Sequence, residues 1–132
     1  MKLVAGIDIG GTKTKIGLVN QEGHCLEHTF YRTREYPDLD KYLDRLVHEV
    51  SELKKKFPDE VDLLGFGIGA PNASSRNGTI VSASNLAWKG VVPILDKLKE
   101  RTDTPLKIMN DASAAALGEM LFGAAKGMQD FI

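Results

Sequence analysis

The sequence predicts an α/β domain built on a mixed five-stranded sheet with helices on both faces. Two observations lead to this fold class. Apolar runs of strand length alternate with longer stretches whose apolar residues recur every three or four positions, which is the helical period. Their order is three strands, then helix, strand, helix, strand and helix. Consecutive strands form a β-meander, whereas each later strand–helix–strand unit needs a parallel crossover, so the sheet contains both directions.

The three N-terminal strands are predicted from β-forming residues that short polar turns separate. Leu3–Ile9 is a near-continuous apolar run, as expected for a strand covered on both faces. A second strand is predicted over Lys15–Asn20, and the turn at Asn20–Gly23 leads to a third over Cys25–Thr33. The glycine-rich stretch between the first two strands is therefore a hairpin and not a strand-to-helix turn.

The remaining elements follow the helical and strand periods in turn. Apolar positions from Leu39 to Phe57 form a helical stripe, which Pro58 ends. Pro93 is compatible with a later helix because it lies in the first turn. The elements after the first helix are predicted as strands over Asp62–Ala70, Thr79–Ser82 and Leu106–Met109, a loop over Pro71–Gly78, and helices over Val91–Arg101 and Asp111–Phe122.

Composition limits the classes of function. The chain has 132 residues, the length of one ordinary domain, and its net charge of −1 argues against broad capture of nucleic acid or of an anionic membrane. Cys25 is the only cysteine, so neither an internal disulfide nor a four-thiolate zinc site can form. A reducing compartment fits best. The short apolar run before Asp8 provides no signal peptide and no membrane span, and we expect a cytoplasmic protein.

The hairpin sequence from Ala5 to Gly17, AGIDIGGTKTKIG, is the first candidate site. Adjacent glycines, here Gly10 and Gly11, let backbone N–H groups approach a phosphate closely. Asp8 lies where a carboxylate can hold Mg²⁺ or a water bound to it. An ordinary tight β-turn also explains the two glycines, and the pattern alone leaves both interpretations open.

A second candidate is the pair Asn110–Asp111, placed where a strand ends and a helix begins. Ligands of α/β sheets bind at the carboxyl ends of strands, so Asp111 can accept a proton from a substrate hydroxyl that attacks a phosphate. Aspartate is also a preferred helix N-cap, and from the residues alone the cap is the commoner explanation. Trp88 either stacks on a sugar or anchors its segment in the core. His24 and His28 are too far apart along a strand to bind one ion.

Five motifs together resemble one known family over essentially the whole chain. They are GIDIGGTKTKIGLV, GIGAPN, SNLAWKG, NDASAAALGE and FGAAKG, and they occur in the order found in the ROK family of sugar kinases and sugar-responsive repressors. The resemblance implies an actin-like ATPase (ribonuclease H-like) fold and ATP-dependent phosphorylation of a hexose, as in glucokinase. It implies the following site residues: Asp8, Gly10, Gly11, Thr12 and Lys13 for Mg-ATP phosphates, Gly69, Asn85, Asn110 and Asp111 for the sugar, and Asp111 as catalytic base.

The resemblance also implies what lies outside these residues. Residues 1–132 correspond to the N-terminal actin-like lobe, so the chain is expected to be truncated before a C-terminal lobe and inactive by itself. ATP and Mg²⁺ are the expected cofactors, and a structural zinc belongs only to the missing lobe. The partners expected are hexose and ATP, with a homodimer as the complete form and no nucleic acid or membrane. Ser113 and Asn72 depart from the family pattern and leave the sugar open. A non-catalytic sugar-sensing protein of the same family is the alternative, and an actin-like activator of a partner enzyme is a third reading.

Overall fold

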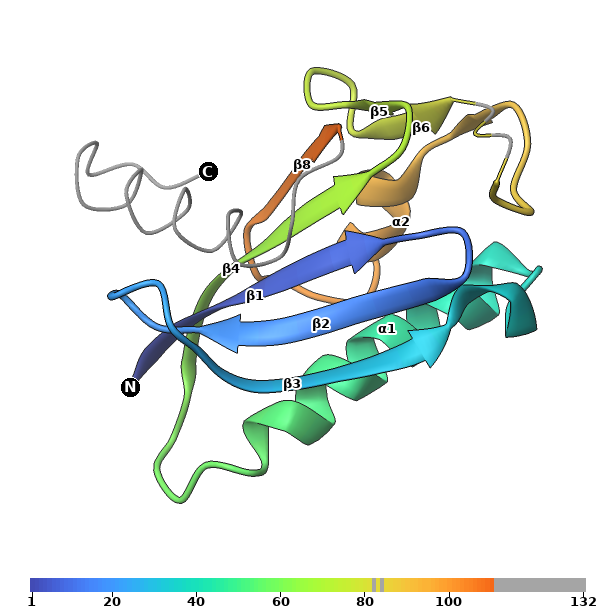
Figure 1. Cartoon of the computed structure of the whole chain (residues 1–132). Coiled ribbons are helices and arrows are strands. Elements are labelled where there is room, and N and C mark those ends of the chain that lie inside the picture. Colours follow the sequence, from blue (N-terminus) through green and yellow to red (C-terminus); the bar gives the residue numbers. More distant parts are fainter. Residues whose placement is uncertain (82, 84, 111–132) are drawn as a thin grey trace.

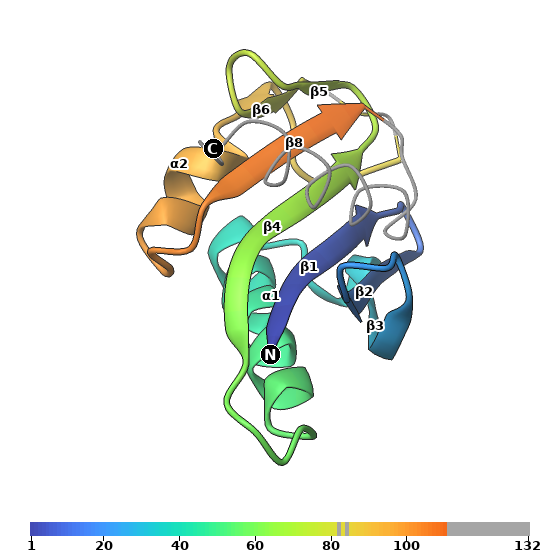
Figure 2. The ribbon, with the colours of Figure 1, turned by 90° about the vertical axis from the view of Figure 1, so that its left-hand side faces the viewer.

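A five-stranded sheet forms the centre of the computed structural model, which describes residues 1–81, 83 and 85–110. The strands are β1 (Lys2–Ile9), β2 (Lys13–Val19), β3 (Cys25–Arg32), β4 (Asp62–Ala70) and β8 (Leu106–Asn110). Their spatial order is β3-β2-β1-β4-β8, with β1, β2 and β3 antiparallel and with β4 and β8 parallel to β1 (Figures 1 and 2). The predicted meander and the predicted parallel additions are both confirmed.

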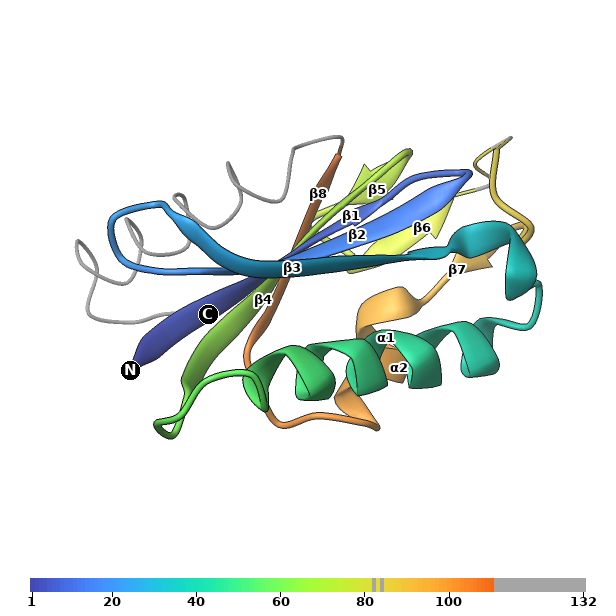
Figure 3. The same cartoon turned by 60° about the horizontal axis from the view of Figure 1, so that its bottom comes forward.

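Two helices cover one face of this sheet. They are α1 (Leu39–Lys54) and α2 (Ile94–Lys99), and Figure 3 shows both on the same side. A short 3-10 helix η1 (Thr33–Glu35) links β3 to α1. The carboxylate of Asp38 caps α1 by accepting a hydrogen bond of 3.0 Å from the Asp40 N–H. The helix predicted over Asp111–Phe122 lies outside the described residues, so the expectation of helices on both faces is confirmed only for this first face.

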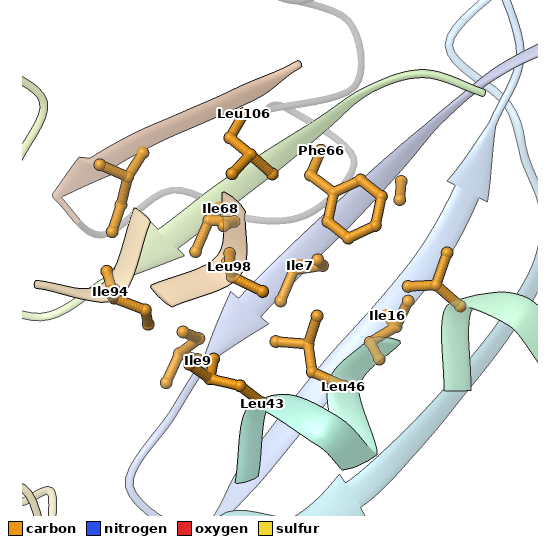
Figure 4. Packing of buried hydrophobic residues seen from close by; sticks show 14 of the residues in the cluster. Ile7, Ile9, Ile16, Leu43, Leu46, Phe66, Ile68, Ile94, Leu98 and Leu106 are labelled. Carbon is orange, nitrogen blue, oxygen red and sulfur yellow. The ribbon is translucent and has the colours of Figure 1, made fainter. Parts of the chain in front are cut away.

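The hydrophobic core lies between the sheet and the two helices. Ile7 and Ile9 of β1 face Leu43 and Leu46 of α1, and all four are almost completely buried (Figure 4). Side chains alternate across a strand, so Asp8 between the two isoleucines projects from the opposite face of the sheet. The packing that fixes α1 under the sheet thus also directs Asp8 away from the helices.

Ion pairs join the outer ends of the two helices. Arg101 contacts Asp44 at 2.7 Å and Asp40 at 3.0 Å, and Lys97 contacts Asp40 at 2.9 Å. Hydrogen bonds from Lys97 and then from Arg101 lower the pKa of Asp40. Such pairs near the surface contribute little to stability, and they link the first turns of α1 to the C-terminal end of α2.

A second, three-stranded sheet corrects two predictions. Its strands are β5 (Ala73–Ser74), β6 (Thr79–Val81) and β7 (Val91–Val92), in the order β5-β6-β7. The predicted helix over Val91–Arg101 is wrong at both ends, because the two valines pair with β6, Pro93 is the N-cap and the helix ends at Lys99. The predicted loop over Pro71–Gly78 contains β5, which pairs with β6 after Asn72 adopts a positive φ of 53°.

Other boundaries shift by a few residues. The strand predicted from Lys15 begins at Lys13, because the hairpin loop is shorter than expected. Helix α1 ends at Lys54 and not near Phe57, and Lys55 is its C-cap. None of the helices in the described ranges is long and apolar enough to cross a membrane.

Replacing Leu46 by alanine tests the position of the core. Leu46 is fully buried, so we expect Leu46→Ala to lower the free energy of unfolding by about 2–5 kcal/mol through lost burial and the cavity left behind. Leu26→Ala is the matched control, because this leucine is 39% exposed on β3 and its truncation should cost less than about 0.5 kcal/mol. Urea unfolding of the 132-residue chain measures both, and equal losses would contradict this assignment of the core.

Candidate functional site

The carboxyl ends of three parallel strands meet at one edge of the main sheet. Asp8 of β1 pairs with Gly69 of β4, Gly69 pairs with Met109 of β8, and Ala70 pairs with Asn110. The arrowheads of β1, β4 and β8 point to this edge in Figure 1. Adjacent strands are about 4.8 Å apart, so Asp8, Gly69 and Met109 form one row, and Asn110 is the next residue of β8 at the same edge. The structure thus brings together three residues that the sequence predicted separately.

The turn between β1 and β2 ends at the same edge. The Gly10 N–H donates to the Lys13 carbonyl at 2.9 Å, which leaves Gly11 and Thr12 as a two-residue hairpin loop. The Thr33 N–H donates to the Thr12 carbonyl at 3.0 Å and ties this loop to the end of β3. Within the described ranges, the N–H groups of Gly11 and Thr12 donate to no other group. The hairpin is confirmed, and these two N–H groups, not that of Gly10, are the donors that an anion can reach.

Gly10 and Gly11 are required by close approach and not by unusual φ angles. A Cβ at Gly10 would lie 2.8 Å from the Lys13 carbonyl oxygen. A Cβ at Gly11 would lie 2.8 Å from the backbone oxygen of Asn85 and 2.9 Å from its Cβ. The second glycine therefore makes room for the segment that carries Asn85. This contact places the predicted sugar residue directly against the predicted phosphate turn.

The Asn85 segment is anchored in the core on both sides of an exposed side chain. Leu86 and Trp88 are 3% and 6% exposed, whereas Asn85 faces solvent. The Trp88 ring packs on Tyr42 of α1 with ring centroids 4.4 Å apart. Trp88 is therefore an anchor, as one of its two sequence interpretations proposed, and its position fixes the backbone that presents Asn85.

Lys15 is the cationic residue that the sequence analysis missed. It lies directly opposite Asp8 in the β1–β2 register, where side chains on the same face are about 5 Å apart at Cβ. Counting outward from a two-residue loop at Gly11–Thr12 gives this pair, so the signal was present once the loop length was known. A carboxylate and an ammonium group on one face beside the turn can hold a metal ion and an anion side by side.

Lys13, in contrast, is directed away from the loop. Its ammonium nitrogen lies 4.7 Å from the ring centroid of Phe30 on β3, in a cation–π contact. Both residues, with Lys15 and His28, line a groove of about 420 Å³ along β2 and β3. The role of Lys13 at a phosphate stays a prediction, and it would require the side chain to leave Phe30.

The end of β8 presents the remaining sugar candidate. Asn110 is exposed and is the last residue of the strand, at the edge described above. Asp111 follows it directly in the chain but lies outside the described residues, so its two interpretations, base and helix cap, both stay open. Across residues 1–81, 83 and 85–110, no cluster of three or more His, Cys, Asp or Glu side chains could bind a metal ion.

Comparison with known proteins gives the family. The model of the ROK family matches residues 4–132. The glucokinase of Streptomyces coelicolor is 33% identical over 133 aligned residues, which cover 100% of this chain and 40% of that protein. The xylose repressor of Caldicellulosiruptor bescii is 32% identical over 98% of this chain and 33% of its own length. This chain thus spans about 40% of the glucokinase relatives that it matches.

The architecture agrees with this result. A ROK family glucokinase from Streptomyces griseus, solved in complex with glucose and AMPPNP, superposes with a TM-score of 0.73 at 34% identity, over 95% of this chain and 38% of that one. The mixed sheet and its helices are those of an actin-like ATPase domain, the fold of the ROK sugar kinases. Family match, relatives and fold agree, and the chain belongs to the ROK family.

Proposed function

We propose that the complete protein is an ATP-dependent hexose kinase of the glucokinase type and that residues 1–132 are its N-terminal actin-like lobe. The observation that carries the proposal is the contact between Gly11 and Asn85. It brings a turn with two available N–H donors and an exposed amide side chain to the same edge of the sheet. A kinase needs this juxtaposition, because the transferring phosphoryl group and the accepting hydroxyl must be held close together.

The residues divide between the two substrates. The N–H groups of Gly11 and Thr12 hold nucleotide phosphates, and the missing Cβ at Gly11 lets the loop lie against the segment that carries Asn85. Asp8 holds Mg²⁺ directly or through water, which suits an ion that nucleotide phosphates bind as well. Lys15 offsets negative charge beside it.

The sugar residues come from the neighbouring strands. Asn85 and Asn110 bind sugar hydroxyls, and Gly69 between them gives the sugar room above the sheet. Asp111 accepts the proton of the attacking sugar hydroxyl while the oxygen of that hydroxyl bonds to the γ-phosphorus of ATP. The bond from the γ-phosphorus to the bridging oxygen breaks, and ADP leaves with that electron pair. Bound Mg-ATP supplies the phosphoryl group and neutralises its developing charge.

The second wall of the cleft belongs to the remainder of the protein in this proposal. Phosphoryl transfer depends on positioning and on exclusion of water, and one lobe provides neither in full. The 132-residue chain is therefore expected to be inactive when assayed alone. An enzyme-like rate of ATP turnover with glucose from this chain would contradict the two-lobe account.

A kinase assay of the complete protein tests the function. ADP release is measured with glucose, mannose, fructose, N-acetylglucosamine and N-acetylmannosamine, each with and without ATP and Mg²⁺. We expect sugar-dependent ADP release for at least one of these sugars. Absence of ADP release with all five sugars, although one of them binds, would favour the alternative of a sugar-sensing protein. That alternative has support in the similarity to a xylose repressor.

Asp8→Asn tests the metal role at the turn. Loss of the carboxylate charge should weaken Mg-ATP binding. We expect kcat/KM for ATP to fall by about 10–100-fold, the loss typical when a residue that supports a bound metal ion through its ligands is removed. Sugar affinity should be unchanged, because Asn85 and Asn110 are untouched. Steady-state kinetics at several Mg²⁺ concentrations measure the effect, and an unchanged dependence on Mg²⁺ would remove Asp8 from this role.

A further inference from the structure

Three buried hydroxyl groups lie behind the phosphate turn and have no part in the proposed chemistry. The Thr14 hydroxyl contacts that of Tyr42 at 2.6 Å and that of Thr33 at 2.8 Å. All three residues are at most 4% exposed, and they come from β2, α1 and η1. A chain of three hydroxyls joins three elements just after the turn.

This hydroxyl chain has little freedom to rearrange. The Thr14 hydroxyl has one proton, so it donates to at most one neighbour and at least one of Tyr42 and Thr33 donates to it. Burial raises the pKa of Tyr42, so its hydroxyl stays protonated at every physiological pH. Inside a protein such bonds are strengthened by the low dielectric, and a buried hydroxyl that loses its partner is penalised. Removal of one member therefore disturbs the other two.

The chain of hydroxyls is connected to the turn through backbone. Thr33, whose side chain is one member, donates its N–H to the Thr12 carbonyl at 3.0 Å. Thr14, the central member, is the second residue after the loop and pairs with Ile9 of β1. The hydroxyl chain is thereby connected to the Thr12 carbonyl inside the loop and to the Ile9–Thr14 pair that flanks the loop.

Tyr42 is also in contact with the other half of the site. Its ring packs on Trp88, which anchors the segment that presents Asn85. The Tyr42 hydroxyl thus bonds to Thr14 of β2, the strand that follows the phosphate turn. The Tyr42 ring contacts Trp88, which anchors the segment that carries Asn85. Helix α1 is fixed to the sheet by its core leucines, so this side chain is a rigid spacer.

We propose that Tyr42 is a positioning residue that sets the Gly11–Thr12 loop and the Asn85 segment in register with each other. The role of this register in phosphoryl transfer rests on the proposed kinase function. Tyr42 touches neither substrate. It acts through Thr14 and Thr33 on the loop and through Trp88 on Asn85, and the transfer step is sensitive to small displacements of either.

Two variants that remove a hydroxyl at nearly constant shape test the proposal. Tyr42→Phe keeps the ring contact, Thr14→Val keeps the branched shape, and Thr14→Ser keeps the central hydroxyl. In the complete protein we expect kcat to fall about 10-fold for Tyr42→Phe and Thr14→Val, with the KM for sugar little changed, because positioning and not sugar binding is lost. Thr14→Ser should remain within about 3-fold of wild type, and the double variant should lose no more than the larger single loss.

A matched control separates positioning from stability. Val50→Ala truncates a buried residue of α1 that has no part in the hydroxyl chain, and it should lower stability without changing kcat. If Tyr42→Phe and Thr14→Val change kcat no more than Val50→Ala does, the role of Tyr42 in transfer is overturned.

Amide exchange tests the same inference without any enzyme activity. In the complete protein, the Thr33 amide should exchange about 10-fold faster in Tyr42→Phe and Thr14→Val than in Val50→Ala variants, because its bond to the Thr12 carbonyl loosens. Unchanged exchange at Thr33 would overturn the proposal that Tyr42 holds the loop. An inactive complete protein would instead refute the kinase function, while the exchange result still decides what Tyr42 does.

Discussion

Gly11→Ala is expected to reduce sugar phosphorylation by the complete protein by about 100-fold or more. The added methyl group would lie 2.8 Å from the Asn85 backbone oxygen and 2.9 Å from its Cβ, closer than real Cβ contacts allow. Both atoms belong to a segment that Leu86 and Trp88 fix in the core, so the loop and the segment must separate. A displacement of this kind misaligns phosphate and sugar together. Steady-state kinetics with the preferred sugar measure the loss.

Gly17→Ala is the control for this substitution on the same hairpin. The nearest atom to its added methyl group is the Cys25 sulfur at 2.8 Å, which is the end of a movable side chain. We expect activity within about 3-fold of wild type, because a rotamer change removes the clash. Equal losses for the two variants would show that any added bulk on the hairpin is harmful and that the Gly11–Asn85 contact is not special.

Asp111→Asn is expected to lower kcat by about 100- to 10,000-fold, the range typical for loss of a general base. The substitution separates the two interpretations of this residue. Asparagine caps a helix about as well as aspartate. If Asp111 only caps the helix, the substitution should therefore leave both stability and activity nearly unchanged. An amide cannot accept the hydroxyl proton, so a base would not tolerate it.

Sugar binding provides the control for Asp111→Asn. The amide still makes hydrogen bonds to a hydroxyl, and Asn85 and Asn110 are unchanged, so the Kd for sugar should move by less than about 10-fold. Calorimetric titration of the complete protein measures it. Retained kcat would remove Asp111 from the base role, and a lost sugar affinity would indicate that it chiefly binds.

Local sequence patterns were sufficient for the strands of the five-stranded sheet and for the hairpin. The apolar run before Asp8 and the glycine pair after it specify a strand and a tight turn without reference to other parts of the chain. The position of β7 was missed although signals for it were present. Valine favours strands, and the residue before a proline avoids helical geometry, so Val92 before Pro93 belongs to extended chain.

The assembly of the site could not be predicted from such patterns. Gly11 and Asn85 are far apart in sequence, and no local rule indicates that one makes room for the other. The position of Lys15 opposite Asp8 depends on the loop length, since one more residue in the loop would turn Lys13 and Lys15 together to the other face of the sheet. The hydroxyl chain of Thr14, Thr33 and Tyr42 likewise exists only after three elements have packed.

A structure of the complete protein with AMPPNP, Mg²⁺ and the preferred sugar tests the central claim most directly. That claim is that one edge of this sheet holds both substrates, with phosphate at the turn and sugar on the neighbouring strands. We predict phosphate oxygens within about 3 Å of the Gly11 and Thr12 nitrogens, and sugar hydroxyls within the same distance of Asn85 and Asn110. Nucleotide bound away from the turn, or sugar that contacts neither asparagine, would contradict the account.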